Sequence, residues 1–148
     1  MLGKKMKLLK NQKGLTLVEL LAVIVILGVI AAIAIPSIGG VIKSSKLNAD
    51  TESESLLRET AIRYLTDMDP DGNGKKSDGT TGVTGLTFAS TGDSTLKVDS
   101  LVSEGYLRAI PRKQSADTPT NFNEVTVKYE AGKGWDAKSV STAAVTSP

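Results

Sequence analysis

The chain has 148 residues, 23% of them charged, and contains neither cysteine nor histidine. That length suits one domain with a modest core. The absence of cysteine excludes a disulfide framework, thiolate metal sites and cysteine nucleophiles, and the absence of histidine removes the commonest general base and transition-metal ligand. An active site could still be built from carboxylates, lysine or serine, but no motif in the sequence indicates one. We therefore predict that the protein is not an enzyme.

The net charge of +2 is unevenly distributed along the chain. Residues 1–14 carry five lysines and no acid, whereas residues 15–148 carry 13 basic and 16 acidic groups. A basic head in front of an apolar run is typical of membrane targeting. The acidic remainder would repel a phosphate backbone, so we do not expect DNA as a direct ligand.

The apolar run follows the basic head directly, and residues 20–42 are 23 consecutive positions without a charge. As a helix this stretch would be about 34 Å long, enough to cross a hydrocarbon core of about 30 Å. A cleavable secretory signal has a shorter apolar region of about 7–15 residues. We therefore predict a retained single membrane span with a cytoplasmic N-terminus and the bulk of the chain outside.

Two residues in this run are unusual for a plain anchor. Glu19 lies one turn inside it, where a charge deep in a bilayer costs about 3 kcal/mol or more. Pro36 lacks a backbone donor and should kink the helix, and Gly28 should loosen it. In a generic anchor Glu19 would be an interfacial carboxylate and Pro36 an incidental kink.

Residues 13–21, with the sequence KGLTLVELL, resemble the class III signal of the type IV pilin superfamily. That family includes type IV pilins, competence pilins and the pseudopilins of type II secretion. The resemblance implies that a prepilin peptidase cuts between Gly14 and Leu15 on the cytoplasmic face and N-methylates Leu15. The family usually has phenylalanine at that first mature position.

Three further positions extend the resemblance over about 35 residues. Glu19, Gly28 and Pro36 match the family's glutamate, glycine and proline at the fifth, fourteenth and twenty-second mature positions. Glycine and proline are then expected at helix kinks, and Glu19 in subunit assembly. The cleaved Leu15 would carry a cationic α-amine, whose reference pKa is about 7.7–8. Because an unpaired buried charge costs about 3–5 kcal/mol, we expect the amine of a neighbouring subunit to pair with Glu19.

The resemblance implies an α+β fold in which a long N-terminal helix packs against a small antiparallel sheet. Residues 1–14 would be the leader, and the helix would span residues 15–66, with residues 15–42 as membrane segment and filament core. Residues 67–148 would form the head. The second half of the helix is expected to be amphipathic, because apolar residues recur at helical period, at Leu57, Ala61, Tyr64, Leu65 and Met68.

The function implied is that of a structural subunit of a type IV pilus, serving adhesion, motility or DNA uptake. The precursor would sit in lipid in the cytoplasmic membrane, and an assembly ATPase and its platform would move it into a homo-oligomeric helical filament at the cell surface. A pseudopilin of a type II secretion or competence system is the alternative. A signal-anchored calcium-binding surface module is the rival from another class.

Residues 67–78 begin with DMDPDGNG, a pattern that both ends a helix and resembles a calcium loop. Aspartates at positions one, three and five repel one another unless solvent or a cation screens them. Position twelve holds an aspartate in place of the usual glutamate. If calcium binds, its predicted ligands are Asp67, Asp69, Asp71, Asn73 and Asp78. The alternative is a solvated helix stop, and no other cofactor is predicted.

The head is predicted to contain a loop over residues 67–98, with a short strand near residues 83–89, and an antiparallel sheet over about residues 122–140. Residues 123–130 alternate apolar and polar side chains, and residues 132–134 supply the turn to a return strand. The aromatic residues expected in the core are Tyr64, Phe88, Phe122, Tyr129 and Trp135. The basic cluster of Arg108, Arg112 and Lys113 is expected to be a solvated loop.

Overall fold

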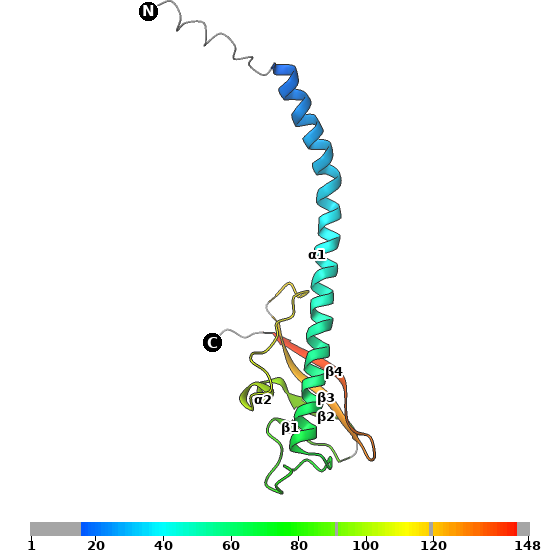
Figure 1. The fold of residues 1–148 in the computed structure, drawn as a ribbon, viewed down its shortest axis with the longest axis vertical. Coiled ribbons are helices and arrows are strands. Elements are labelled where there is room, and N and C mark those ends of the chain that lie inside the picture. Colours follow the sequence, from blue (N-terminus) through cyan, green and yellow to red (C-terminus); the bar gives the residue numbers. More distant parts are fainter. Residues whose placement is uncertain (1–15, 91, 119, 145–148) are drawn as a thin grey trace, which may run out of the picture. The chain divides into compact units, whose positions relative to one another are not determined.

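The computed structural model describes residues 16–90, 92–118 and 120–144, and it confirms the α+β class (Figure 1). In chain order the elements are α1 (Leu17–Met68), β1 (Leu86–Thr87), β2 (Ser94–Lys97), α2 (Val98–Ser103), β3 (Thr120–Glu130) and β4 (Gly134–Ala144). The chain divides into two units, residues 1–42 and 43–148. The second unit holds the sheet, α2 and the second half of α1.

Helix α1 is unbroken through Gly28, Pro36 and the glycine pair at residues 39–40, so none of these residues ends it. It ends at Met68, two residues beyond the predicted boundary. The two halves differ in burial. The first half has no buried residue, whereas from residue 50 onward one face is buried, comprising Asp50, Leu57, Thr60, Ala61, Tyr64 and Leu65. The predicted apolar stripe therefore faces the core of the head.

The sheet is an antiparallel meander with strand order β1-β2-β3-β4. Strands β3 and β4 form the long hairpin, in which Val125 lies opposite Val140. Strand β1 lies within the short strand predicted near residues 83–89, whereas β2 lies in a part of residues 67–98 that was expected to be loop. Alternation over the four residues of β2 is too short to stand out in a segment rich in glycine, serine and threonine. Pairing with β3 stabilises β2, for example where Leu96 lies opposite Val125.

The core lies between the second half of α1 and one face of the sheet. Its largest fully buried side chains include Tyr64, Phe122 and Leu101, and Trp135 is 6% exposed. The prediction for Phe88 is wrong, because its side chain is 38% exposed. The chain leaves β1 at Thr87, and the Phe88 ring packs against Gly74 instead, where a Cβ would lie only 2.6 Å from the ring.

Candidate functional site

The first turn of α1 is capped by Thr16. Its Oγ1 accepts a hydrogen bond from the backbone N–H of Glu19 at 3.3 Å, and its carbonyl accepts one from Leu20 at 3.1 Å. A threonine followed three residues later by glutamate is the spacing of a capping box. The sequence analysis missed this signal. Glu19 is therefore in the first turn of the helix, where the helix dipole favours a negative charge.

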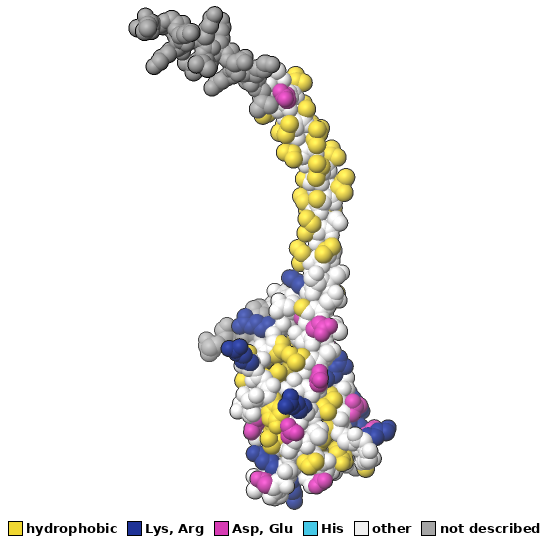
Figure 2. Space-filling view, in the orientation of Figure 1, with side chains coloured by type: hydrophobic (Ala, Val, Ile, Leu, Met, Phe, Trp, Pro, Cys, Tyr) yellow, Lys and Arg dark blue, Asp and Glu magenta, His cyan; other side chains and the backbone are white. Residues whose placement is uncertain are grey.

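The apolar surface of α1 is bare over residues 17–42. Its large apolar side chains are 49–80% exposed, and Figure 2 shows the run as a nearly continuous apolar surface. An 18-residue window has a mean hydropathy of 3.0, and none of it is buried. By length and composition, this helix is long and apolar enough to cross a membrane. A core helix of a soluble protein passes the same composition test, but it would be covered by its own chain.

The glycines of this segment have no packing partner among the residues that the structure describes. A Cβ added at Gly28, Gly39 or Gly40 would meet nothing within 4 Å. Contacts inside the described chain therefore do not require glycine at these positions. Small residues on an apolar helix allow another helix to approach closely. The glycines thus suit contacts with a partner helix.

The predicted cleavage residues Gly14 and Leu15 lie outside the described residues. The structure begins at Thr16, one residue beyond the predicted mature N-terminus.

Asp69, the central residue of the predicted calcium loop, is satisfied by backbone groups. Its side chain is 1% exposed. Its Oδ1 accepts a hydrogen bond from the N–H of Asn73 at 3.0 Å, and its Oδ2 accepts one from Gly74 at 2.6 Å. These two hydrogen bonds hold the chain in its reversal after α1, and each oxygen of the carboxylate accepts one of them from the loop backbone.

The other predicted ligands do not converge on Asp69. Asp67 accepts a hydrogen bond from the hydroxyl of Tyr106 at 2.9 Å, and Asp78 accepts two from Thr80. Within the described ranges there is no group of three or more acidic side chains placed to hold a metal ion. In the part of the chain that the structure describes, the predicted calcium ligands are therefore not gathered around one point. Spacing along the sequence suggested a calcium site, but the loop turns its carboxylates toward different donors.

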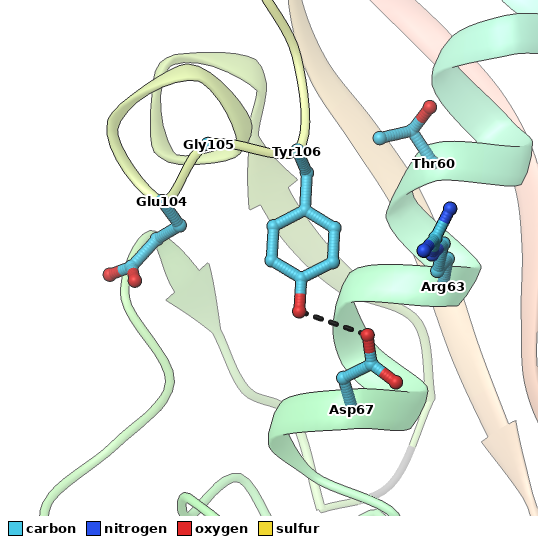
Figure 3. Close-up of a pocket in the computed structure, with 6 residues that line it drawn as sticks. All are labelled: Thr60, Arg63, Asp67, Glu104, Gly105 and Tyr106. Atoms are coloured by element: carbon cyan, nitrogen blue, oxygen red, sulfur yellow. Dashed lines mark hydrogen bonds between the residues drawn. The ribbon is translucent and has the colours of Figure 1, made fainter.

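A polar pocket of about 300 Å³ lies beside Tyr106, and Figure 3 shows the residues that line it: Thr60, Arg63, Asp67, Glu104, Gly105 and Tyr106. The Tyr106 hydroxyl points toward Asp67, and Glu104 points away from it. Burial, together with the Asp67 carboxylate, raises the pKa of Tyr106. The hydroxyl thus keeps its proton and donates a hydrogen bond to Asp67, which makes Tyr106 a structural contact and a poor nucleophile.

Asp50 is a buried acid that the sequence analysis did not single out. Its side chain is 4% exposed, and it accepts hydrogen bonds from the N–H groups of Gln114 at 2.5 Å and Ser115 at 3.0 Å. Burial alone would raise its pKa, but the hydrogen bonds from Ser115 and Gln114 and the charge of Lys113 outweigh burial and lower it. The donors are backbone groups 64 and 65 residues away, so no local sequence signal could have revealed the contact.

The predicted basic cluster lies on the segment between α2 and β3. Arg108 and Arg112 are exposed, and Lys113 is half-buried. The segment is held to the sheet by a bridge between Arg112 and Asn121 and by the N–H of Lys113, which donates to the carbonyl of Thr120 at 2.9 Å.

Comparison with known families gives one match. Residues 9–35 match the family model described as the prokaryotic N-terminal methylation motif, which is the type IV prepilin-like signal. No curated protein and no solved structure matches the chain. The matched span includes Gly14, Leu15, Glu19 and Gly28, and Pro36 follows it directly. Together with the long helix and the antiparallel sheet, the match fits the pilin and pseudopilin superfamily.

The motif has general consequences for processing. It implies cleavage by a prepilin peptidase and assembly into filaments, and it is typical of a structural protein and not of an enzyme class. The apolar helix near the N-terminus is consistent with membrane anchoring of the precursor.

Proposed function

We propose that the protein is a structural subunit of a type IV pilus. The precursor enters the cytoplasmic membrane with its N-terminus in the cytoplasm, is cut between Gly14 and Leu15, is methylated on Leu15, and is assembled into a helical fibre. One observation carries this proposal: the methylation motif over residues 9–35 coincides with a helix whose apolar surface is bare.

The exposed apolar surface of the helix must be shielded from water both in the precursor and in the assembled fibre. Lipid covers it in the membrane, and the same segments of other copies would cover it in a fibre. Because lipid tails are as apolar as leucine, moving the helix from lipid to protein gains little hydrophobic free energy. Assembly then requires work from an ATP-driven machine. A contact between different patches of successive copies produces an open helical fibre when the rotation between copies does not close a ring.

Glu19 supplies specificity within that apolar contact. It is the only charged residue between positions 17 and 42. In a fibre core its carboxylate would require a cation, since an unpaired buried charge costs about 3–5 kcal/mol. The α-amine of Leu15 on an adjacent copy supplies that cation after cleavage. The pairing would therefore select cleaved subunits in the correct register.

The decisive experiment is mass spectrometry of surface fibres isolated from cells that produce the protein at its native level. We expect the protein in those fibres as a chain that starts at Leu15 and carries one added methyl group. A chain that starts at Met1, or one found only as a monomer in the membrane, would overturn the proposal. A cleaved chain that is absent from surface fibres, with protein secretion lost on gene deletion, would assign it to the pseudopilins instead.

A further inference from the structure

Two lysines follow the apolar run at the depth of lipid headgroups, if residues 20–42 span the membrane as proposed. Lys43 comes directly after Ile42, and Lys46 lies about 6 Å beyond Ile42 along the helix axis. The headgroup region on each side of a bilayer is about 5–8 Å thick. Both side chains are exposed, and their long stems allow the ammonium groups to reach the phosphates.

The fold brings two further cations to the same face of α1. Asp50 lies seven residues after Lys43 and four after Lys46, so all three positions share one side of the helix. The Asp50 carboxylate accepts hydrogen bonds from the N–H groups of Gln114 and Ser115. These two residues come directly after Arg112 and Lys113. At a helical rise of about 1.5 Å per residue, Asp50 lies about 12 Å beyond the end of the span, which is about 4–7 Å outside the headgroup layer.

The exposed charge of this region is mainly positive. Asp50 is the only acidic residue between Glu19 and Glu52, and it is buried and occupied by backbone donors. Asp117 is the one exposed acid on the loop of residues 112–118. In the described ranges, Lys43, Lys46, Arg112 and Lys113 take part in no salt bridge. These four residues are called the basic collar.

The rest of the head has the opposite sign. Residues 43–148 contain 13 basic and 15 acidic side chains, and only nine basic ones remain when the collar is set aside. In Figure 2, Lys and Arg side chains are seen at the top of the head, and both basic and acidic side chains are spread over the remainder of that face.

We propose that the basic collar binds anionic phospholipid headgroups of the outer leaflet while the subunit is held in the membrane. The inference rests on the proposed function, because it requires the span to be inserted. An anionic membrane surface attracts basic side chains within about one Debye length, roughly 8 Å at physiological salt. DNA is the less favoured partner, because the head apart from the collar is net acidic and would repel a phosphate backbone.

The test uses the full chain reconstituted in vesicles. The chain has no cysteine, so Thr118→Cys, at an exposed loop position, gives a single labelling site for a fluorophore. Vesicles of phosphatidylcholine alone are compared with vesicles that also contain phosphatidylglycerol, each with a nitroxide quencher on a fraction of the headgroups. We expect at least about twofold stronger quenching in the anionic vesicles, reduced by high salt.

The variants separate the collar from total charge. Lys46→Gln with Lys113→Gln should remove most of the preference for anionic vesicles. The matched control, Lys75→Gln with Lys76→Gln, removes the same charge from the loop after α1 and should keep the preference. Equal quenching in both kinds of vesicle, or equal loss in both variants, would overturn the inference.

Two further measurements assign the remaining outcomes. Insertion is checked first by resistance to alkaline carbonate. A chain that washes off would overturn the proposed function together with this inference, whereas an inserted chain without lipid preference would overturn only the inference. A DNA duplex that abolishes the quenching at matched phosphate concentration would overturn it in favour of nucleic acid.

Discussion

Asp69 shows how one carboxylate closes the chain reversal after α1. It is buried, and its two oxygens accept hydrogen bonds from the N–H groups of Asn73 and Gly74. A calcium loop needs several carboxylates aimed at one point, but Asp67 and Asp78 are directed to other donors. At Asp69, backbone N–H groups bond to the carboxylate oxygens, which in a calcium loop would coordinate the cation.

We expect Asp69→Ala to lower the free energy of unfolding of the head by about 1–3 kcal/mol, because the N–H groups of Asn73 and Gly74 lose their acceptor. Asp69→Asn is the matched control, since it keeps one acceptor oxygen and should cost less. Thermal unfolding of the full chain in detergent measures both. Calcium should not change either melting temperature. A calcium-dependent rise in the wild type that Asp69→Ala abolishes would restore the calcium hypothesis.

The buried carboxylate of Asp50 should make the stability of the head depend on pH. Hydrogen bonds from Ser115 and Gln114 outweigh the effect of burial, so the folded pKa lies below the unfolded reference of about 3.9. A lowered folded pKa contributes stability that is fully present above the unfolded pKa and lost as pH falls through the folded one. The head should therefore lose stability as the pH falls below about 4.

Unfolding by urea as a function of pH measures this contribution. Asp50→Asn should remove the part of the acid-induced loss that is due to the loop contact, and it should lower stability at neutral pH. Asp136→Asn, which changes an exposed carboxylate on β4, is the control. An identical pH profile for wild type and Asp50→Asn would show that the contact does not depend on the ionised carboxylate.

At the scale of elements, long-range hydrogen bonds join the end of α1 to the β3–β4 hairpin. The indole Nε1 of Trp135 donates to the carbonyl of Asp69 at 2.6 Å, and the hydroxyl of Tyr129 donates to the carbonyl of Pro70 at 3.2 Å. The two rings meet edge to face at 5.5 Å. Gly72 lies under Tyr129 with a φ of 64°, and a Cβ there would be 2.0 Å from the ring.

These two aromatics form a matched pair for mutation. Trp135→Phe leaves a buried carbonyl without its donor and should lower the free energy of unfolding by about 1–3 kcal/mol. Tyr129→Phe breaks an exposed contact, where water replaces the donor, so its cost should be clearly smaller. Chemical unfolding of the two variants provides the comparison. Equal costs would mean that ring packing, and not the indole hydrogen bond, holds the hairpin to the helix end.

The strands differed in how far local pattern could predict them. Residues 123–130 alternate clearly, and the glycines at 132 and 134 mark the turn, so the hairpin of β3 and β4 was expected. Strand β1 lies within the predicted short strand and pairs with β2, whereas β2 has four residues, was not predicted, and pairs with β3 through contacts far apart in sequence. Phe88 was assigned to the core by residue type, but its strand ends one residue too early to direct it there.

At the scale of the whole molecule, the chain joins an apolar helix without cover to a folded head. Residue 19 carries the only charge between positions 17 and 42. The pairing of this carboxylate with a terminal amine is the step that the proposed assembly depends on, because lipid and protein offer the helix similar apolar surroundings.

We expect Glu19→Ala to insert into the membrane as the wild type does and to be excluded from fibres, because it cannot pair with the α-amine of a neighbouring copy. Membrane fractionation and quantification of sheared fibres measure the two steps separately. Glu52→Ala, which removes an exposed acid from the second half of α1, serves as the control. Normal fibre yield from Glu19→Ala would contradict the assigned role.

The sequence by itself determined the features that depend on neighbouring residues. The basic residues of positions 1–14, the uncharged run of residues 20–42 and the spacing of Gly14 and Glu19 are local patterns, and so is the alternation that forms the long hairpin. Only the tertiary structure decided where individual polar groups find partners. Asp50 meets backbone donors more than sixty residues away, and the carbonyl of Asp69 meets the indole of Trp135, which is 66 residues along the chain. The physical reason is that a buried carboxylate must satisfy its hydrogen bonds wherever the folded chain places a donor, and sequence spacing does not contain that position.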